Sequence, residues 1–178
     1  MSLAMGSSSL LSAHPFPLIR SGGVFLCVVG LSIMVGALVP RWLWGSFVTG
    51  VLVASIVVMI TTRDLAAPLG SPTGFQVGSL LLALAIEAFA VMWLSSRLRS
   101  AHLAYRALSM LIVVGAHFFL MAPAFGPLIV LLGLSTIGSA AMGLRAGPNS
   151  WLVCWFVDGA LKAGVGGAMF WSAPRITW

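Results

Sequence analysis

Six long runs of apolar residues, separated by short segments that hold most of the charged residues, make up nearly the whole chain. Each run is about 20 residues long, the length that a helix needs to cross the hydrocarbon core of a membrane. Because backbone groups in lipid must satisfy one another, we expect each run to be helical. The sequence therefore predicts an all-α membrane protein, a bundle of six transmembrane helices with short loops. The predicted spans are Gly22–Val39, Leu43–Thr62, Gly74–Ser96, Ala101–Met121, Phe125–Leu144 and Trp151–Ser172.

The composition agrees with a membrane protein and excludes other classes. Only 7% of the 178 residues are charged, whereas soluble proteins carry about 25%, and an apolar content of 60% is too high for a disordered chain. The net charge of +6 does not indicate nucleic-acid binding, because the nine Lys and Arg residues are spread singly near the ends of the apolar runs. The expected partner is the lipid bilayer, with no nucleic acid.

The segments between the spans are too short to form a soluble domain. We expect a flexible N-terminal tail over residues 1–20, a transmembrane domain over residues 21–173 and a short C-terminal tail over residues 174–178. Any activity is therefore expected within the membrane or at its two faces.

The distribution of cations predicts the orientation. The first, third and fifth loops and their flanks carry five arginines, Arg41, Arg97, Arg99, Arg106 and Arg145. The opposite side carries three, Arg20, Arg63 and Arg175, with Asp64 beside the second. Since cytoplasmic loops hold the excess of Lys and Arg, we expect a multi-pass protein of a bacterial inner membrane, with both termini on the extracytoplasmic side.

Four ionisable residues stand out because they lie well away from the ends of the predicted spans, and these are the candidate functional residues: Glu87, His117, Asp158 and Lys162. An ionisable residue within a membrane is costly, and this makes each one a hypothesis of function. Glu87 must be protonated, paired or in contact with water. It is a candidate proton carrier or cation ligand, and the alternative is a protonated side chain that bonds a neighbouring helix.

Asp158 and Lys162 are predicted to pair, because residues four apart on a helix share one face. Lys162 is too far from either end of its span to reach water fully, so it needs this partner. The pair is either structural or part of a binding site. His117 is a candidate proton relay or a hydrogen-bonded link between helices. No metal site is predicted, and Cys27 and Cys154 are expected to be packing residues.

Small residues at four-residue spacing predict close helix packing and an interface for a homo-oligomer. The three ladders are Gly159/Ala163/Gly167, Ala160/Gly164/Ala168 and Ser135/Ser139/Gly143. As an alternative, the glycines that follow Lys162 at positions 164, 166 and 167 could unwind the helix, as at the binding sites of some transporters.

Two resemblances accompany these patterns. The segment Gly115-Ala-His117-Phe-Phe-Leu120-Met-Ala-Pro-Ala-Phe-Gly126 resembles small uncharacterised bacterial membrane proteins with six helices, in which a proline usually stands in place of Leu120. This resemblance implies the fold and no activity. Asp158-Gly-Ala-Leu-Lys162-Ala-Gly-Val-Gly166 resembles the last helix of microbial rhodopsins, which implies a retinal Schiff base on Lys162 with Asp158 and Glu87 as counter-ions. That fold has seven spans, and this chain has six.

The leading hypothesis is transport or binding of a small solute or ion, in a proton-coupled form, through a buried polar centre. The first alternative is a non-catalytic assembly or regulatory partner of a membrane complex. Further alternatives are an intramembrane enzyme of lipid or isoprenoid chemistry, with Asp158 or Glu87 as general acid, and a retinal-binding photoreceptor. Apart from that retinal alternative, no cofactor is expected, and no catalytic residue is assigned.

Overall fold

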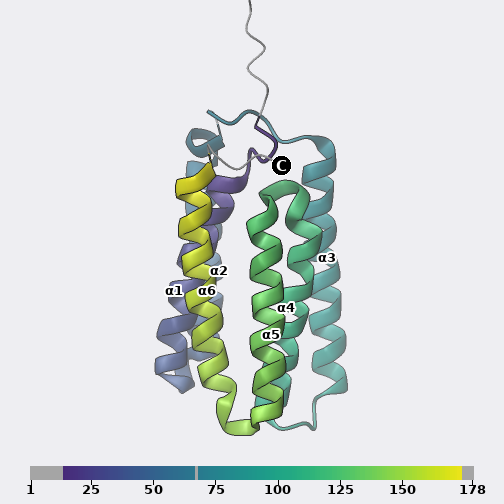
Figure 1. The fold of residues 1–178 in the computed structure, drawn as a ribbon. Helices are drawn as coiled ribbons and strands as arrows, with labels where there is room; N and C mark the ends of the chain where they lie inside the picture. The colour runs from purple at the N-terminus through teal and green to yellow at the C-terminus, as the bar shows by residue number, and fades with distance from the viewer. Residues whose placement is uncertain (1–13, 67, 174–178) are drawn as a thin grey trace, which may run out of the picture.

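The computed structural model describes residues 14–66 and 68–173, and these form an all-α bundle without strands (Figure 1). Six of the helices are long and apolar enough to cross a membrane, so the protein is a multi-pass membrane protein. All six predicted spans are confirmed, with ends that differ by a few residues. The helices are α1 (Ile19–Leu38), α2 (Leu43–Ala66), α3 (Gly74–Arg97), α4 (Leu103–Phe125), α5 (Pro127–Ala146) and α6 (Trp151–Ser172), with short 3-10 turns η1 (Pro40–Trp42) and η2 (Pro148–Ser150).

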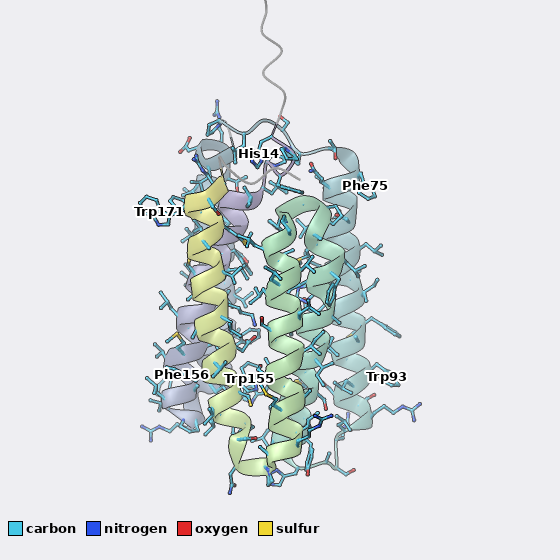
Figure 2. All side chains as sticks on the ribbon, viewed as in Figure 1. His14, Phe75, Trp93, Trp155, Phe156 and Trp171 are labelled. Atoms are coloured by element: carbon cyan, nitrogen blue, oxygen red, sulfur yellow. The ribbon has the colours of Figure 1, made fainter. Side chains whose placement is uncertain are left out.

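Successive helices run in opposite directions, and α6 lies beside α1. α1 packs most extensively on α6 and also on α2, while α4 packs on α5 and α3, and α5 meets α6. α2 and α3 are outer helices that bury few residues. Figure 2 shows Phe75 and Trp93 of α3 extending away from the bundle, as expected for a helix that faces lipid. The buried middle of the bundle is therefore formed mainly by α1, α4, α5 and α6.

Glycines bring α1 and α6 into backbone contact. A Cβ atom on Gly30 would lie 2.5 Å from the carbonyl oxygen of Gly159, and one on Gly23 would lie 2.6 Å from that of Gly166. Only residues without a side chain allow so close an approach. The first predicted ladder thus contributes Gly159 to this interface, whereas Gly167 has open space around its Cα.

α6 remains a continuous helix from Trp151 to Ser172. The alternative prediction that the glycines after Lys162 unwind the helix is therefore wrong. In lipid an unwound turn would leave backbone groups unsatisfied unless protein or water replaced the lost bonds. Here Gly166 is used for packing against α1 instead.

The N-terminal segment before α1 packs across one end of the bundle from His14 onwards, within the predicted tail. Phe16 is 2% exposed and covers Gly126, which joins α4 to α5 in the left-handed region at φ +87°. Gln76 donates hydrogen bonds from Nε2 to the carbonyl oxygens of Pro15 (2.7 Å) and Pro123 (3.0 Å). Residues 1–13 and 174–178, which include Arg175, lie outside the described residues.

Candidate functional site

Asp158 and Lys162 form an ion pair at the centre of the bundle. The carboxylate of Asp158 is 0% exposed and Lys162 is 3% exposed. The Lys162 ammonium donates to Oδ2 of Asp158 one turn earlier on α6. The contact predicted from the four-residue spacing is therefore present, and its surroundings are fully desolvated.

Thr136 of α5 completes the hydrogen bonding of this carboxylate. Its hydroxyl is fully buried and donates to Oδ1 of Asp158 at 2.8 Å. Both carboxylate oxygens therefore have a donor, as a buried charge requires. Thr136 is not among the residues predicted from the sequence. The available signal was its position three residues before Ser139, which places both residues on the face of α5 that packs against α6.

Glu87 and His117 form the second acid–base pair. Nε2 of His117 on α4 lies 3.5 Å from Oε2 of Glu87 on α3. His117 is 7% exposed, but the side chain of Glu87 is 24% exposed because α3 is an outer helix. The structure thus brings together two candidate residues from different helices, and the side chain of Glu87 is partly exposed on the outer face of the bundle.

Phe118 lies between the two pairs. Its ring is 5.6 Å from the Lys162 ammonium, within range of a cation–π contact, and its centroid is 4.4 Å from that of the His117 ring. The four residues therefore converge in one polar centre contributed by α3, α4 and α6, with Thr136 added by α5.

The charges of this polar centre do not balance by themselves. Glu87 and Asp158 are two acids, and Lys162 is the one permanent cation of the set. A charge left over in a low-dielectric interior is costly. One further positive charge is needed for neutrality, and a proton on Glu87 or His117 supplies it. The arrangement can therefore hold one exchangeable proton beside the Asp158–Lys162 ion pair.

Across the described ranges, no three residues of the types His, Cys, Asp and Glu lie together as metal ligands. Both cysteines are free thiols at helix contacts: Sγ of Cys27 lies 3.4 Å from the carbonyl oxygen of Ala163, and Sγ of Cys154 lies 3.5 Å from that of Ser139.

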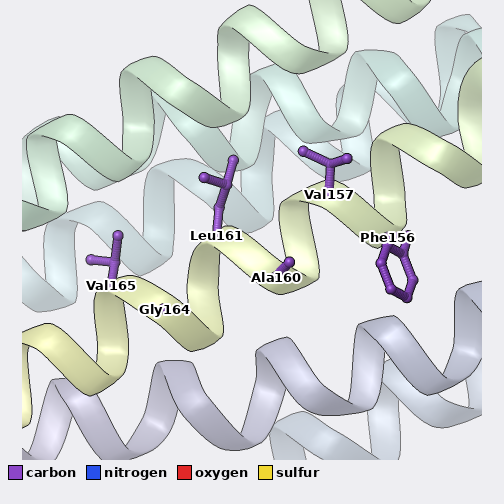
Figure 3. A pocket seen from close by; sticks show the side chains of 6 residues that line it. All are labelled: Phe156, Val157, Ala160, Leu161, Gly164 and Val165. Carbon is purple, nitrogen blue, oxygen red and sulfur yellow. The ribbon is translucent and has the colours of Figure 1, made fainter.

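An apolar groove of about 450 Å³ lies on the outer face of α6. Figure 3 shows Val157, Leu161 and Val165 along one side of it and Phe156 on the other, with Ala160 and Gly164 between them. The second predicted ladder thus lies on an exposed face, where a homo-oligomer contact stays a prediction. None of the four ionisable residues lines this groove.

Comparison with protein families identifies the chain as a member of DUF6609, a family of unknown function whose model matches residues 12–177. A family of unknown function fits the predicted resemblance to an uncharacterised family, whereas the motif over Gly115–Gly126 stays a prediction. No curated protein and no solved structure matches the chain. The arrangement of the polar centre is therefore the basis for a functional proposal.

Proposed function

We propose that this protein carries a small solute or ion across the membrane, coupled to protons, through the polar centre of Glu87, His117, Asp158 and Lys162. One observation carries the proposal: the buried centre holds two acids and one permanent cation, and needs one further proton to be neutral. A purely structural ion pair gains little in a dry interior, since desolvation can exceed the attraction. Retaining both pairs in one place is better explained by a charge that enters and leaves.

In this proposal Glu87 and His117 carry the proton, and the Asp158–Lys162 pair opens to bind the charged group. Glu87 is the less buried acid and lies on α3, away from the packed interface of α1 and α6, so protonation of Glu87 leaves that interface in place. Transport requires two conformations with access from opposite sides, and binding shifts the population between them. If the proton leaves when a positively charged group binds, the polar centre stays neutral in both conformations.

We also propose the orientation expected from the sequence, in a bacterial inner membrane. Arg41, Arg97 and Arg145 lie in or beside the connections α1–α2, α3–α4 and α5–α6, which Figure 1 shows at the end of the bundle opposite the N-terminal segment. The excess of cations would place that end in the cytoplasm and both termini outside.

The test is Glu87→Gln in proteoliposomes that contain a trapped pH dye, challenged with a panel of charged solutes under a pH gradient. Solute-dependent proton movement should occur with the wild type and be lost in the variant. Asp64→Asn is the matched control, because it makes the same carboxylate-to-amide change at an exposed residue near the end of α2. Unchanged proton movement in Glu87→Gln would remove Glu87 from the mechanism. A stoichiometric protein partner, together with no flux for any solute, would favour the regulatory alternative.

A further inference from the structure

The ammonium of Lys162 lies between its own ion pair and helix α4. It contacts Asp158 and lies 5.6 Å from the centre of the Phe118 ring. His117, which precedes Phe118 on α4, lies 3.5 Å from Glu87. A lysine side chain has a flexible stem of four carbons, so the ammonium can move while the helix stays in place. The Phe118 face offers a favourable contact on the path between the two carboxylates.

We propose that Lys162 is a tethered cation that exchanges between Asp158 and Glu87, and that the position it vacates beside Asp158 and Thr136 binds a monovalent alkali cation. This inference rests on the proposed function and specifies its substrate class. One proton is then exchanged for one monovalent cation in each cycle.

The charges balance in both states. In the first state Glu87 is protonated and Lys162 pairs with Asp158, so the three side chains sum to zero. In the second, the Glu87 carboxyl has released its proton to water, Lys162 pairs with the Glu87 carboxylate, and the alkali cation replaces the ammonium at Asp158. The sum is again zero, whereas a divalent cation would leave one positive charge buried without a partner. No covalent bond changes except the O–H bond of Glu87.

The vacated position offers oxygen atoms, which hard cations prefer. Asp158 contributes two carboxylate oxygens, and the hydroxyl of Thr136, 2.8 Å from Oδ1, already lies at the carboxylate. Both residues are fully buried, so a bound ion would be shielded from water. Gly30 of α1 packs against the Cβ of Lys162, where a larger residue would crowd the stem of the moving side chain.

The inference predicts an unusual pattern of single and double variants. In Glu87→Gln the neutral amide cannot attract the ammonium, so Lys162 stays on Asp158 and blocks the cation. Replacing Lys162 as well, in the double variant Glu87→Gln/Lys162→Met, frees Asp158 to exchange its own proton for the cation. Activity lost in the single variant should therefore return in the double variant. Glu87→Gln/Arg63→Met is the matched control, because it removes an exposed cation away from the polar centre.

The experiment uses the full chain in proteoliposomes with a trapped pH dye and an acidic lumen, to which sodium, potassium or lithium chloride is added, with choline chloride as the control salt. Alkali salts should drive proton efflux from wild-type vesicles, at a rate that clamping the membrane potential at zero leaves unchanged. Glu87→Gln and Asp158→Asn should each lower the rate at least about tenfold. Thr136→Val should weaken the apparent cation affinity about tenfold, the effect of losing one hydrogen-bonding group at a charge.

Two results would overturn the inference, provided that each variant elutes as a single species and melts cooperatively. If alkali salts move no protons in the wild type while another solute does so in a manner that depends on Glu87, the tethered cation is wrong and the proposed function stands. If alkali salts move protons but the double variant stays inactive, Lys162 does not compete for the site. If no tested solute drives proton movement that depends on Glu87 in wild-type vesicles, the proposed function itself is contradicted.

Discussion

Asp158 and Glu87 are both acids in the middle of membrane helices, but they differ in burial and in their hydrogen-bond partners. Asp158 is fully buried, has a donor for each carboxylate oxygen and lies on α6, which packs against α1 and α5. Glu87 is partly exposed, faces one histidine at 3.5 Å and lies on α3, which packs mainly on α4. The contrast separates an acid that is held in the packed interior from one that lies at the edge of the bundle, and the following predictions test that separation.

Lys162→Met should cause the largest loss of stability. It leaves the Asp158 carboxylate buried without its cation, which costs about 3–5 kcal/mol. The free energy of unfolding in detergent at neutral pH measures the loss. Because the penalty belongs to the carboxylate, stability should recover in the double variant Asp158→Asn/Lys162→Met, which removes both charges. An unaltered melting curve would mean that Lys162 already reaches water, and that Asp158 is no more buried from solvent than Glu87.

Gly159→Ala should cost less, about 1–3 kcal/mol, the range for overpacking a tight interface. Its new Cβ would lie 2.7 Å from the carbonyl oxygen of Gly30, in the interface where α1 packs against α6 beside Lys162. Thermal unfolding of Gly164→Ala is the control on the same helix, because nothing lies within 4 Å of that position. Equal melting temperatures for the two variants would show that α1 does not confine the pair.

Thr136→Val should cost about 1 kcal/mol, near the upper range for one hydrogen bond between membrane helices. Valine keeps the shape of the side chain and removes the donor to Oδ1 of Asp158. A double-mutant cycle with Asp158→Asn measures the coupling in free energy of unfolding. Coupling near zero would indicate that Thr136 does not hold the carboxylate.

Glu87→Gln should cause the smallest change in stability, less than about 1 kcal/mol, because one hydrogen bond between membrane helices contributes only about 0.6 kcal/mol on average. The amide can still bond with His117, so chemical denaturation should resemble that of the wild type. A loss as large as that of Lys162→Met would remove the distinction between the two acids.

Sequence patterns predicted what lies within one helix better than what lies between helices. The apolar runs located the six spans, and the four-residue spacing placed Lys162 beside Asp158. The pairing of Glu87 with His117 depends on which faces of α3 and α4 meet. Helix periodicity identifies a polar face but not the neighbouring helix that covers it.

Thr136 shows why one member of the polar centre was missed. Threonine hydroxyls in membrane helices commonly bond to the carbonyl one turn earlier, as Thr61 does to Val57 at 2.7 Å. Only the packing of α5 against α6 distinguishes the hydroxyl of Thr136, which donates to a carboxylate instead. The predicted unwinding near Gly166 was wrong for a related reason, since a glycine in a sequence does not reveal whether it loosens its own helix or admits another one.

The glycine contact between α1 and α6 also has a consequence for biogenesis. α1 leaves the ribosome well before α6, its most extensive partner, so the glycine face of α1 lacks that partner until α6 has been synthesised. α6 also carries Asp158 and Lys162, which enter the membrane already paired with each other. A nascent chain that stops before Trp151 would lack both the partner of α1 and the central charges, and it should be a recognisable target for membrane quality control.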